Sequence, residues 1–146
     1  MPIAERSAQT TWNGSLTQGA GTTTGGSGAL GELPVTWASR TERSDGKTSP
    51  EELLAAAHSS CFSMALSHEL TEAGNKPDRL EVSSTVTLDL VDGAPTVTTS
   101  KLTVRGKVPG IDQAAFEEAA AGAGKNCPVS RALGGVDIQV DATLES

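Results

Sequence analysis

The chain of 146 residues has a formal net charge of -7 and contains two cysteines, two tryptophans, two phenylalanines and no tyrosine. A length of this order fits one domain with its own core, so residues 1–146 are predicted to form a single domain that needs no disulfide to fold. The negative charge argues against a nucleic-acid partner, because the sequence has no basic stripe to contact phosphates.

The N-terminal segment MPIAERSAQT lacks the apolar run of a signal peptide, and no segment approaches the ~20 apolar residues of a membrane span. We therefore expect a cytoplasmic protein with no membrane partner. In that compartment two cysteines are not expected to form a permanent bridge. They are core thiols, metal ligands or redox-active groups.

The N-terminal part is predicted to form short strands. Residues 8–13 and 33–39 are rich in Thr, Val and Trp, and Gly-rich turns separate such stretches. The glycine runs at 19–21 and 25–28 are interpreted as hairpin turns rather than phosphate loops, because neither a helix nor Gly-Lys-Ser/Thr follows them. A polar loop over 41–48 comes next.

The clearest helix start in the sequence is at Ser49, a good N-cap. Pro50 suits the first helical position, Glu52 is placed to complete a capping box, and Gly74 is a natural stop. The helix carries no charge over 53–66, so we expect it to be largely buried. Its apolar stripe is predicted from residues at three- and four-residue spacing: Leu54, Ala57, Cys61, Ala65 and His68.

The remaining elements are a hairpin over 80–108 that turns at 92–95 and bulges at 99–101, a helix over 113–125 capped by Asp112, a short helix from Pro128 to Gly134–Gly135, and a strand over 136–144. Strands and helices are thus partly segregated along the chain. This order predicts an α+β fold with a mainly antiparallel sheet around a central buried helix.

Each cysteine has two interpretations when it is considered alone. Cys61 lies in the middle of the most apolar helix, where most free cysteines are small buried hydrophobes. Cys127 lies at a junction between helices beside Pro128, where the N–H groups of the next helix can lower the pKa of a thiol. It can equally be a core residue.

A metal site is the next alternative. His58 and Cys61 are three residues apart on one helix, and His68 lies two turns beyond Cys61. A structural zinc site needs four ligands, and the sequence offers no Cys-x-x-Cys or His-rich partner. We therefore expect no metal and no cofactor, and interpret His58 as a satisfied, partly buried histidine.

Two cysteine motifs resemble those of the OsmC branch of the OsmC/Ohr peroxidase family. Residues 49–67, SPEELLAAAHSSCFSMALS, resemble its central helix, and residues 126–130, NCPVS, resemble its second cysteine motif. The segments WNG at 12–14 and VPGID at 108–112 are also similar to the family. The resemblance spans essentially the whole chain and implies an OsmC-like fold in an intertwined homodimer.

The resemblance further implies a cysteine-based peroxidase without metal, haem or other cofactor. In this family the first cysteine is peroxidatic and the second resolving, which gives these roles to Cys61 and Cys127. A glutamate and an arginine complete the site. The glutamate falls on Glu51 and the arginine on Arg40, with Arg43 as the alternative because the loop from Arg40 to Glu51 is about one residue longer than is usual. A dihydrolipoamide-type dithiol is the implied reductant.

Physical chemistry supports these roles independently. The nucleophile is a thiolate, and burial disfavours it, so Cys61 needs a nearby cation that cannot lose its proton, such as Arg40. Glu51 can orient that guanidinium through a bidentate ion pair. The guanidinium can also stabilise charge on the departing oxygen. Attack leaves a sulfenic acid on Cys61, which condenses with the thiol of Cys127 before over-oxidation.

The spacing of Glu51 and Cys61 limits how the site can be built. On one straight helix ten residues rise about 15 Å, too far for a shared guanidinium to bridge. Either the helix breaks between them, or Glu51 of one chain serves Cys61 of another. We expect the second, a two-fold dimer with packed central helices.

The expected substrate is an alkyl or fatty-acid hydroperoxide, because the residues available around the thiol are apolar. These residues are Leu54, Phe62, Met64 and either Leu33 or Trp37. Two other classes of function stay open. One is a peroxide-sensing redox module without significant turnover, and the other is a structural domain with two inert thiols.

Overall fold

The computed structural model describes residues 1–145, and the chain divides into two compact units, residues 1–53 and the residues from Leu54 onward. Each unit is described by itself, and the single-domain organisation stays a prediction. The predicted α+β class is confirmed. Within the described residues, no helix combines the length and the apolar character that crossing a membrane requires.

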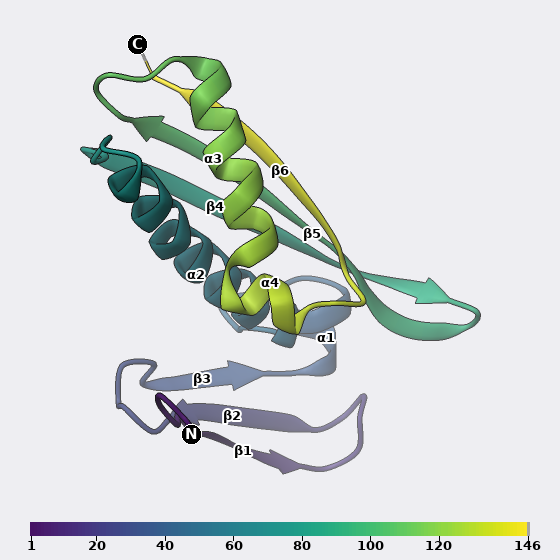
Figure 1. The fold of residues 1–146 in the computed structure, drawn as a ribbon. Coiled ribbons are helices and arrows are strands. Elements are labelled where there is room, and N and C mark those ends of the chain that lie inside the picture. Colours follow the sequence, from purple (N-terminus) through teal and green to yellow (C-terminus); the bar gives the residue numbers. More distant parts are fainter. Residues whose placement is uncertain (146) are drawn as a thin grey trace. The chain divides into compact units, whose positions relative to one another are not determined.

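The first unit contains a three-stranded antiparallel sheet with the order β1–β2–β3, formed by β1 (Ala8–Asn13), β2 (Ala20–Gly25) and β3 (Glu32–Val35) (Figure 1). The predicted strand over 8–13 is confirmed. Threonines favour these strands because β-branched side chains fit a pleated surface. Thr10 and Thr23 lie directly opposite each other, and their Oγ1 atoms are 2.7 Å apart in a cross-strand hydrogen bond.

The strand predicted over 33–39 ends early, at Val35, and the chain turns into the short helix α1 (Trp37–Thr41). Thr36 and Ser39 form a capping box. The Ser39 amide donates to Thr36 Oγ1 at 3.0 Å, and the Thr36 amide donates to Ser39 Oγ at 2.9 Å. In a strand, these two amides would need hydrogen-bond acceptors on a neighbouring strand. Here the capping box satisfies both of them, so local capping overrides the β propensity of Val, Thr and Trp.

Helix α2 (Pro50–Glu72) begins where the sequence predicts. Ser49 Oγ accepts from the Glu52 amide at 3.1 Å, as expected of an N-cap. The other half of the predicted capping box is replaced, because the Glu52 carboxylate accepts from Thr48 Oγ1 at 2.6 Å. Gly74 follows the helix with a φ of 89°, the left-handed conformation that ends many helices.

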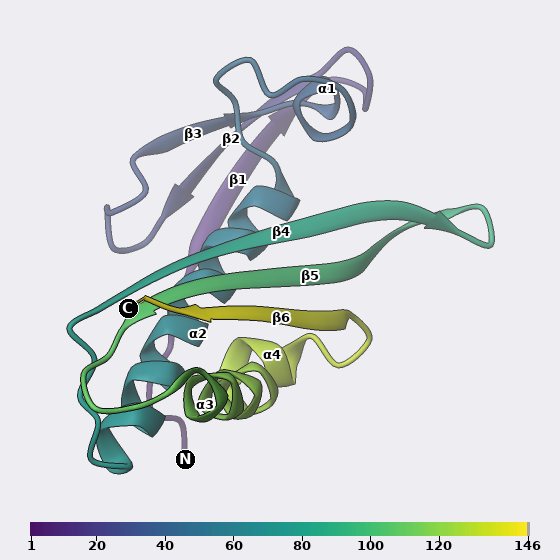
Figure 2. The same cartoon turned by 90° about the horizontal axis from the view of Figure 1, so that it is seen from above.

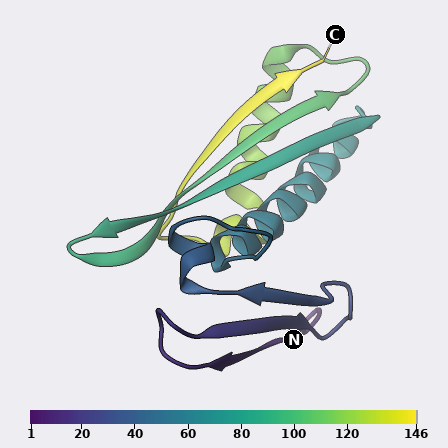
Figure 3. The same cartoon turned by 180° about the vertical axis from the view of Figure 1, so that it is seen from behind.

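The second unit contains a sheet with the order β4–β5–β6, formed by β4 (Arg79–Val91), β5 (Ala94–Lys107) and β6 (Asp137–Leu144). Strands β4 and β5 form the predicted hairpin, whereas β6 pairs parallel to β5. The parallel pairing requires a crossover connection, which α3 (Gln113–Asn126) and α4 (Pro128–Ala132) provide. Helices α2 and α3 lie on the same face of this sheet (Figures 2 and 3).

The hairpin turns at Asp92 and Gly93, which both have positive φ, as the Asp-Gly pair predicts. The bulge lies one residue before its predicted position. Thr87 pairs with Thr99 and Leu88 pairs with Val97, so Thr98 is the extra residue. The alternation of apolar residues along the strand indicates that its phase changes. It does not locate the extra residue more closely than to within one or two positions.

The core of the second unit lies between its sheet and its helices, and it consists of Phe62, Leu66, Leu70, Leu102, Val104, Val108, Phe116, Ala120, Ala123 and Cys127. The stripe predicted for the central helix is only partly right, because Cys61 and Ala65 pack against this core but are not its most buried positions. Beyond its first turn, the buried positions of α2 are His58, Phe62, Leu66 and Leu70, whereas Ala57 and His68 of the predicted stripe are exposed. The helix is uncharged on every side over 53–66, so the sequence pattern alone does not select one face.

The opposite face of α2 is exposed in the single chain, although it carries no charge. Ala56, Ala57, Ser60 and Met64 lie on it, and Met64 is 71% exposed. Within a single chain, only one face of the central helix α2 is therefore buried.

Candidate functional site

Cys61 lies in the second unit on α2, next to the buried core. The spacing of the helix turns its side chain toward α4, and the Val129 amide donates to Cys61 Sγ at 3.5 Å. The thiol is partly exposed, whereas Cys127 is fully buried. Both cysteines are free thiols.

The surroundings of Cys61 change the pKa of its thiol. Burial raises this pKa above its usual value, the amide hydrogen bond from Val129 opposes that shift, and the hydrogen bond and charge interaction with the neighbouring Cys127 raise it further. The structure therefore brings the two predicted redox cysteines together. It also leaves Cys61 largely protonated at neutral pH unless a cation approaches it.

Cys127 occupies the junction between two helices, where the sequence places it. It is the C-cap of α3 and the N-cap of α4. Its Sγ accepts from the Ser130 amide at 3.3 Å and lies 3.0 Å from Ser130 Oγ. Pro128 opens α4 and fixes the backbone between the thiol and these donors.

His58 is fully buried, more deeply than the sequence predicts, and both ring nitrogens are satisfied. Its Nδ1 lies 2.6 Å from Ser100 Oγ on β5, and its Nε2 lies 2.8 Å from Ser130 Oγ. Burial lowers the pKa of His58, so the ring is neutral at pH 7. With both nitrogens engaged by hydroxyls, the ring has no free position for a metal, and residues 1–145 contain no cluster of three or more metal-ligating side chains.

Arg40 and Glu51 form the predicted ion pair in the first unit. Arg40 Nε donates to Glu51 Oε1 at 3.1 Å, and Arg40 Nη2 donates to Oε2 at 2.9 Å. The pair is bidentate and charge-assisted, and the Glu51 side chain is only 9% exposed. Arg43, the alternative, instead contacts Asp45 at 3.6 Å on the surface. Helix α1 positions Arg40, and the first turn of α2 positions Glu51.

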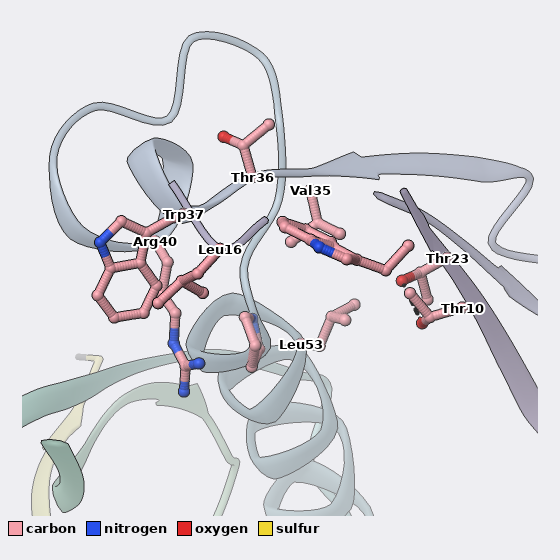
Figure 4. Close-up of a pocket in the computed structure, with 10 residues that line it drawn as sticks. Thr10, Leu16, Thr23, Val35, Thr36, Trp37, Arg40 and Leu53 are labelled. Carbon is pink, nitrogen blue, oxygen red and sulfur yellow. Dashed lines mark hydrogen bonds between the residues drawn. The ribbon is translucent and has the colours of Figure 1, made fainter. Parts of the chain in front are cut away.

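A pocket of about 390 Å³ lies beside Arg40 within the same unit (Figure 4). Its lining is mostly apolar and comes from Thr10, Trp12, Leu16, Thr23, Val35, Thr36, Trp37, Arg40, Pro50 and Leu53. Of the lining residues predicted from the sequence, Trp37 lies here. Phe62 and Met64 do not line this pocket, because Phe62 is a fully buried core residue and Met64 lies on the exposed face of α2.

Sequence reasoning missed the partners of His58 and most of the pocket. Ser130 lies inside the second cysteine motif, so its position could have been singled out, but serine alone does not reveal its contact. Ser100 carries no signal, because it meets His58 only through the fold, 42 residues away.

Comparison with known proteins identifies the relatives of this chain. The family described as OsmC-like protein matches residues 43–141. The chain is 40% identical over 141 residues to Peroxiredoxin OsmC of Escherichia coli (strain K12), and the match covers 97% of each protein.

Solved structures agree with this comparison. The organic hydroperoxide resistance protein OhrB of Bacillus subtilis is 26% identical with a TM-score of 0.75, covering 94% of this chain and 98% of that one. An OsmC-like protein from Mycoplasma pneumoniae is 15% identical with a TM-score of 0.75, covering 99% of this chain and 100% of that one, and this likeness concerns the fold. The chain belongs to the OsmC-like family and is a thiol peroxidase of its OsmC branch.

Proposed function

We propose that this protein reduces organic hydroperoxides to alcohols, with Cys61 as the peroxidatic cysteine and Cys127 as the resolving cysteine. The observation that carries the proposal is the proximity of the two thiols, which is close enough for Cys127 to raise the pKa of Cys61, with Cys61 partly exposed and Cys127 buried. The names of the relatives, a peroxiredoxin and an organic hydroperoxide resistance protein, support the same substrate class.

The reaction has two steps. The Cys61 thiolate attacks the terminal peroxide oxygen, the O–O bond breaks, and the alkoxide takes a proton and leaves as the alcohol. Cys61 then carries a sulfenic acid. Cys127 attacks this sulfur as a thiolate, the S–S bond forms, and the S–O bond breaks to release hydroxide, which takes a proton from solvent and becomes water. A dithiol of the dihydrolipoamide type reduces the disulfide and completes the cycle.

Arg40 supplies the positive charge that the first step needs, and Glu51 fixes the direction of its guanidinium through the bidentate contact. Helix α2 runs without a break from Pro50 to Glu72, so Glu51 and Cys61 are separated by about 15 Å of helical rise. We therefore assign the Arg40–Glu51 pair of one protomer to Cys61 of the other, in a homodimer. The exposed, uncharged face of α2 supports this assembly.

The substrate preference follows from the pocket beside Arg40. Its apolar lining suits the hydrocarbon part of an alkyl or fatty-acid hydroperoxide, and the positive charge of Arg40, one of the lining residues, suits the polar peroxide group. Hydrogen peroxide would leave the apolar lining unused.

A peroxidase assay with cumene hydroperoxide and a dithiol tests the proposal on the wild type and two matched variants. Cys61→Ser is expected to consume no peroxide. Cys127→Ser is expected to consume about one equivalent and then stall or over-oxidise, because its sulfenic acid has no partner. Equal loss of the first turnover in both variants contradicts the assigned order. A wild type that oxidises once but does not turn over indicates a peroxide sensor instead.

A further inference from the structure

A chain of hydrogen bonds connects Cys127 to a buried histidine. Cys127 Sγ lies 3.0 Å from Ser130 Oγ, and Ser130 Oγ lies 2.8 Å from His58 Nε2. On the other side of the ring, His58 Nδ1 lies 2.6 Å from Ser100 Oγ, and Ser100 Oγ lies 3.0 Å from Ser84 Oγ. Four elements (α2, β4, β5 and α4) and the α3–α4 junction contribute to this network, in which His58 and Ser130 are 72 residues apart in the sequence.

The chain of hydrogen bonds matters for the reaction because Cys127 is buried. The side chain is fully buried, and so are His58 and Ser100, whereas Ser84 at the far end is only partly buried. A resolving cysteine must lose its proton before it attacks, because the thiolate is the nucleophile. Solvent has no direct access to Cys127 Sγ. Its hydrogen-bonding partners within residues 1–145 are the amide and hydroxyl of Ser130. The Cys61 thiol is close enough for Cys127 to affect its pKa.

The ring of His58 can accept the proton that Ser130 passes on. A neutral imidazole donates from one nitrogen and accepts at the other. Every group in this series of hydrogen bonds has a partner in one arrangement of the protons. In it, Cys127 donates to Ser130, Ser130 donates to Nε2, Nδ1 donates to Ser100, and Ser100 donates to Ser84. This is the order of a thiol, a hydroxyl and a base, each within hydrogen-bond reach of the next.

We propose that His58 accepts the proton of Cys127 through Ser130 when Cys127 attacks the sulfenic acid of Cys61. His58 is thus a positioning residue for the resolving step, and the inference rests on the proposed function. The thiol proton moves to Ser130 Oγ as the Ser130 hydroxyl proton moves to His58 Nε2. The sulfur electron pair forms the S–S bond, and the hydroxide that leaves Cys61 takes a proton from solvent. The imidazolium returns its extra proton to solvent through Ser100 and Ser84.

The electrostatic setting suits a proton acceptor. Burial lowers the pKa of His58, so the ring is neutral and able to accept at pH 7. The groups that meet it from β5 and α4 are the neutral hydroxyls of Ser100 and Ser130. The titratable groups linked to this network within the described chain are the thiols of Cys127 and Cys61. After transfer, the Ser130 amide and hydroxyl both donate to the Cys127 thiolate.

Single-turnover kinetics of the full-length protein test this inference. Reduced wild type, His58→Gln and Ser130→Ala each receive one equivalent of cumene hydroperoxide, and peroxide loss, sulfenic acid trapping and disulfide formation are followed separately. His68→Gln is the matched control, because His68 is the other histidine of the chain and lies exposed on the same helix. Thermal unfolding checks the fold of each variant.

His58→Gln and Ser130→Ala are both expected to consume the first equivalent of peroxide at the wild-type rate. Both are expected to form the disulfide about 100-fold more slowly or worse, so that trapped sulfenic acid accumulates. Disulfide formation in wild type is expected to be nearly independent of pH around neutrality, because a general base takes the proton. In the variants it is expected to rise about tenfold per pH unit, because hydroxide must replace that base. His68→Gln is expected to behave as wild type.

Wild-type disulfide formation in folded Ser130→Ala overturns the inference, even if His58→Gln proves unstable. The inference is also overturned if peroxide consumption and disulfide formation slow equally in the two variants while the pH profile stays unchanged. That result would assign the network a structural role. These outcomes are separable from failure of the proposed function, in which wild type itself consumes no peroxide.

Discussion

The thiol of Cys61 is poorly prepared for nucleophilic attack by the surroundings that its own chain provides. Burial and the neighbouring Cys127 raise its pKa, and one amide hydrogen bond from Val129 only partly opposes them. A raised pKa leaves little thiolate at pH 7, and the thiolate fraction grows as the pH rises toward that pKa. The proposed first step therefore depends on a cation, and the proposal gives this role to Arg40.

Arg40→Met is expected to lower kcat/KM at pH 7 by about 100-fold, because the thiolate and the departing oxygen both lose a positive charge. The loss is expected to shrink as the pH rises, since hydroxide then ionises Cys61 without help. The rising limb of the pH profile thus moves to higher pH. Steady-state kinetics between about pH 5.5 and 9.5 measure both effects.

Arg43→Met is the matched control, because Arg43 contacts only Asp45 on the surface in the described chain. It is expected to keep the wild-type profile. A reversed result, in which Arg43→Met is impaired and Arg40→Met is not, would move the cationic role to Arg43.

The residues that the sequence identifies are those whose types are chemically distinctive. Cys61 and Cys127 stand out as the two cysteines, and the Arg40–Glu51 ion pair is present with the predicted bidentate geometry. Serines are common and weakly patterned, so Ser100 and Ser130 could not be assigned to His58 before the fold placed them there.

At the scale of elements, the contact between β5 and α3 depends on a missing side chain. Gly106 lies on β5, and a Cβ atom added there would meet Phe116 Cζ at 2.5 Å and Cε1 at 2.6 Å. Phe116 is fully buried in the core of the second unit, so its ring has little freedom to move.

Gly106→Ala is therefore expected to reduce the free energy of unfolding by about 1–3 kcal/mol, the usual cost of overpacking a core. Urea unfolding at equilibrium measures the loss. Gly135→Ala is the control, because a Cβ at Gly135 meets no atom within 4 Å. If the two variants unfold alike, the close approach of β5 and α3 is not a constraint on stability.

The elements themselves were predicted with uneven success, for physical reasons. Strong local signals located the start of α2 at Ser49 and the turn at Asp92–Gly93. Helix α1 was missed because its capping box lies in a run of β-formers. The buried stripe of α2 was predicted only in part, because a helix segment without charges offers several apolar faces and only packing against the sheet selects one.

For the whole molecule, the exposed face of α2 is the feature that a single chain leaves unexplained. Met64 is 71% exposed on a helix face that has no charge, next to Ser60 and Ala57. An uncharged face of this kind on a long helix indicates contact with another protein surface. We assign that surface to the same helix of a second copy.

Met64→Glu is expected to convert the proposed dimer into monomers, because a buried unpaired carboxylate costs several kcal/mol at an interface. Peroxidase turnover is expected to fall with it, since the proposed site uses residues of both protomers. Analytical ultracentrifugation measures the assembly. Ala114→Glu adds the same charge at an exposed position of α3 and is expected to remain dimeric. A Met64→Glu protein that stays dimeric rules out this interface.

The division of the chain at Leu53 has a consequence for how such an enzyme can change over evolution. In the proposed reaction, the apolar pocket selects the peroxide and the Arg40–Glu51 pair polarises it, and both belong to residues 1–53. The two sulfurs and the hydrogen-bonded network that carries the proton of Cys127 belong to the residues that follow. Substitutions that alter which hydroperoxide is accepted can therefore accumulate in one stretch of sequence while the redox couple in the other stays intact.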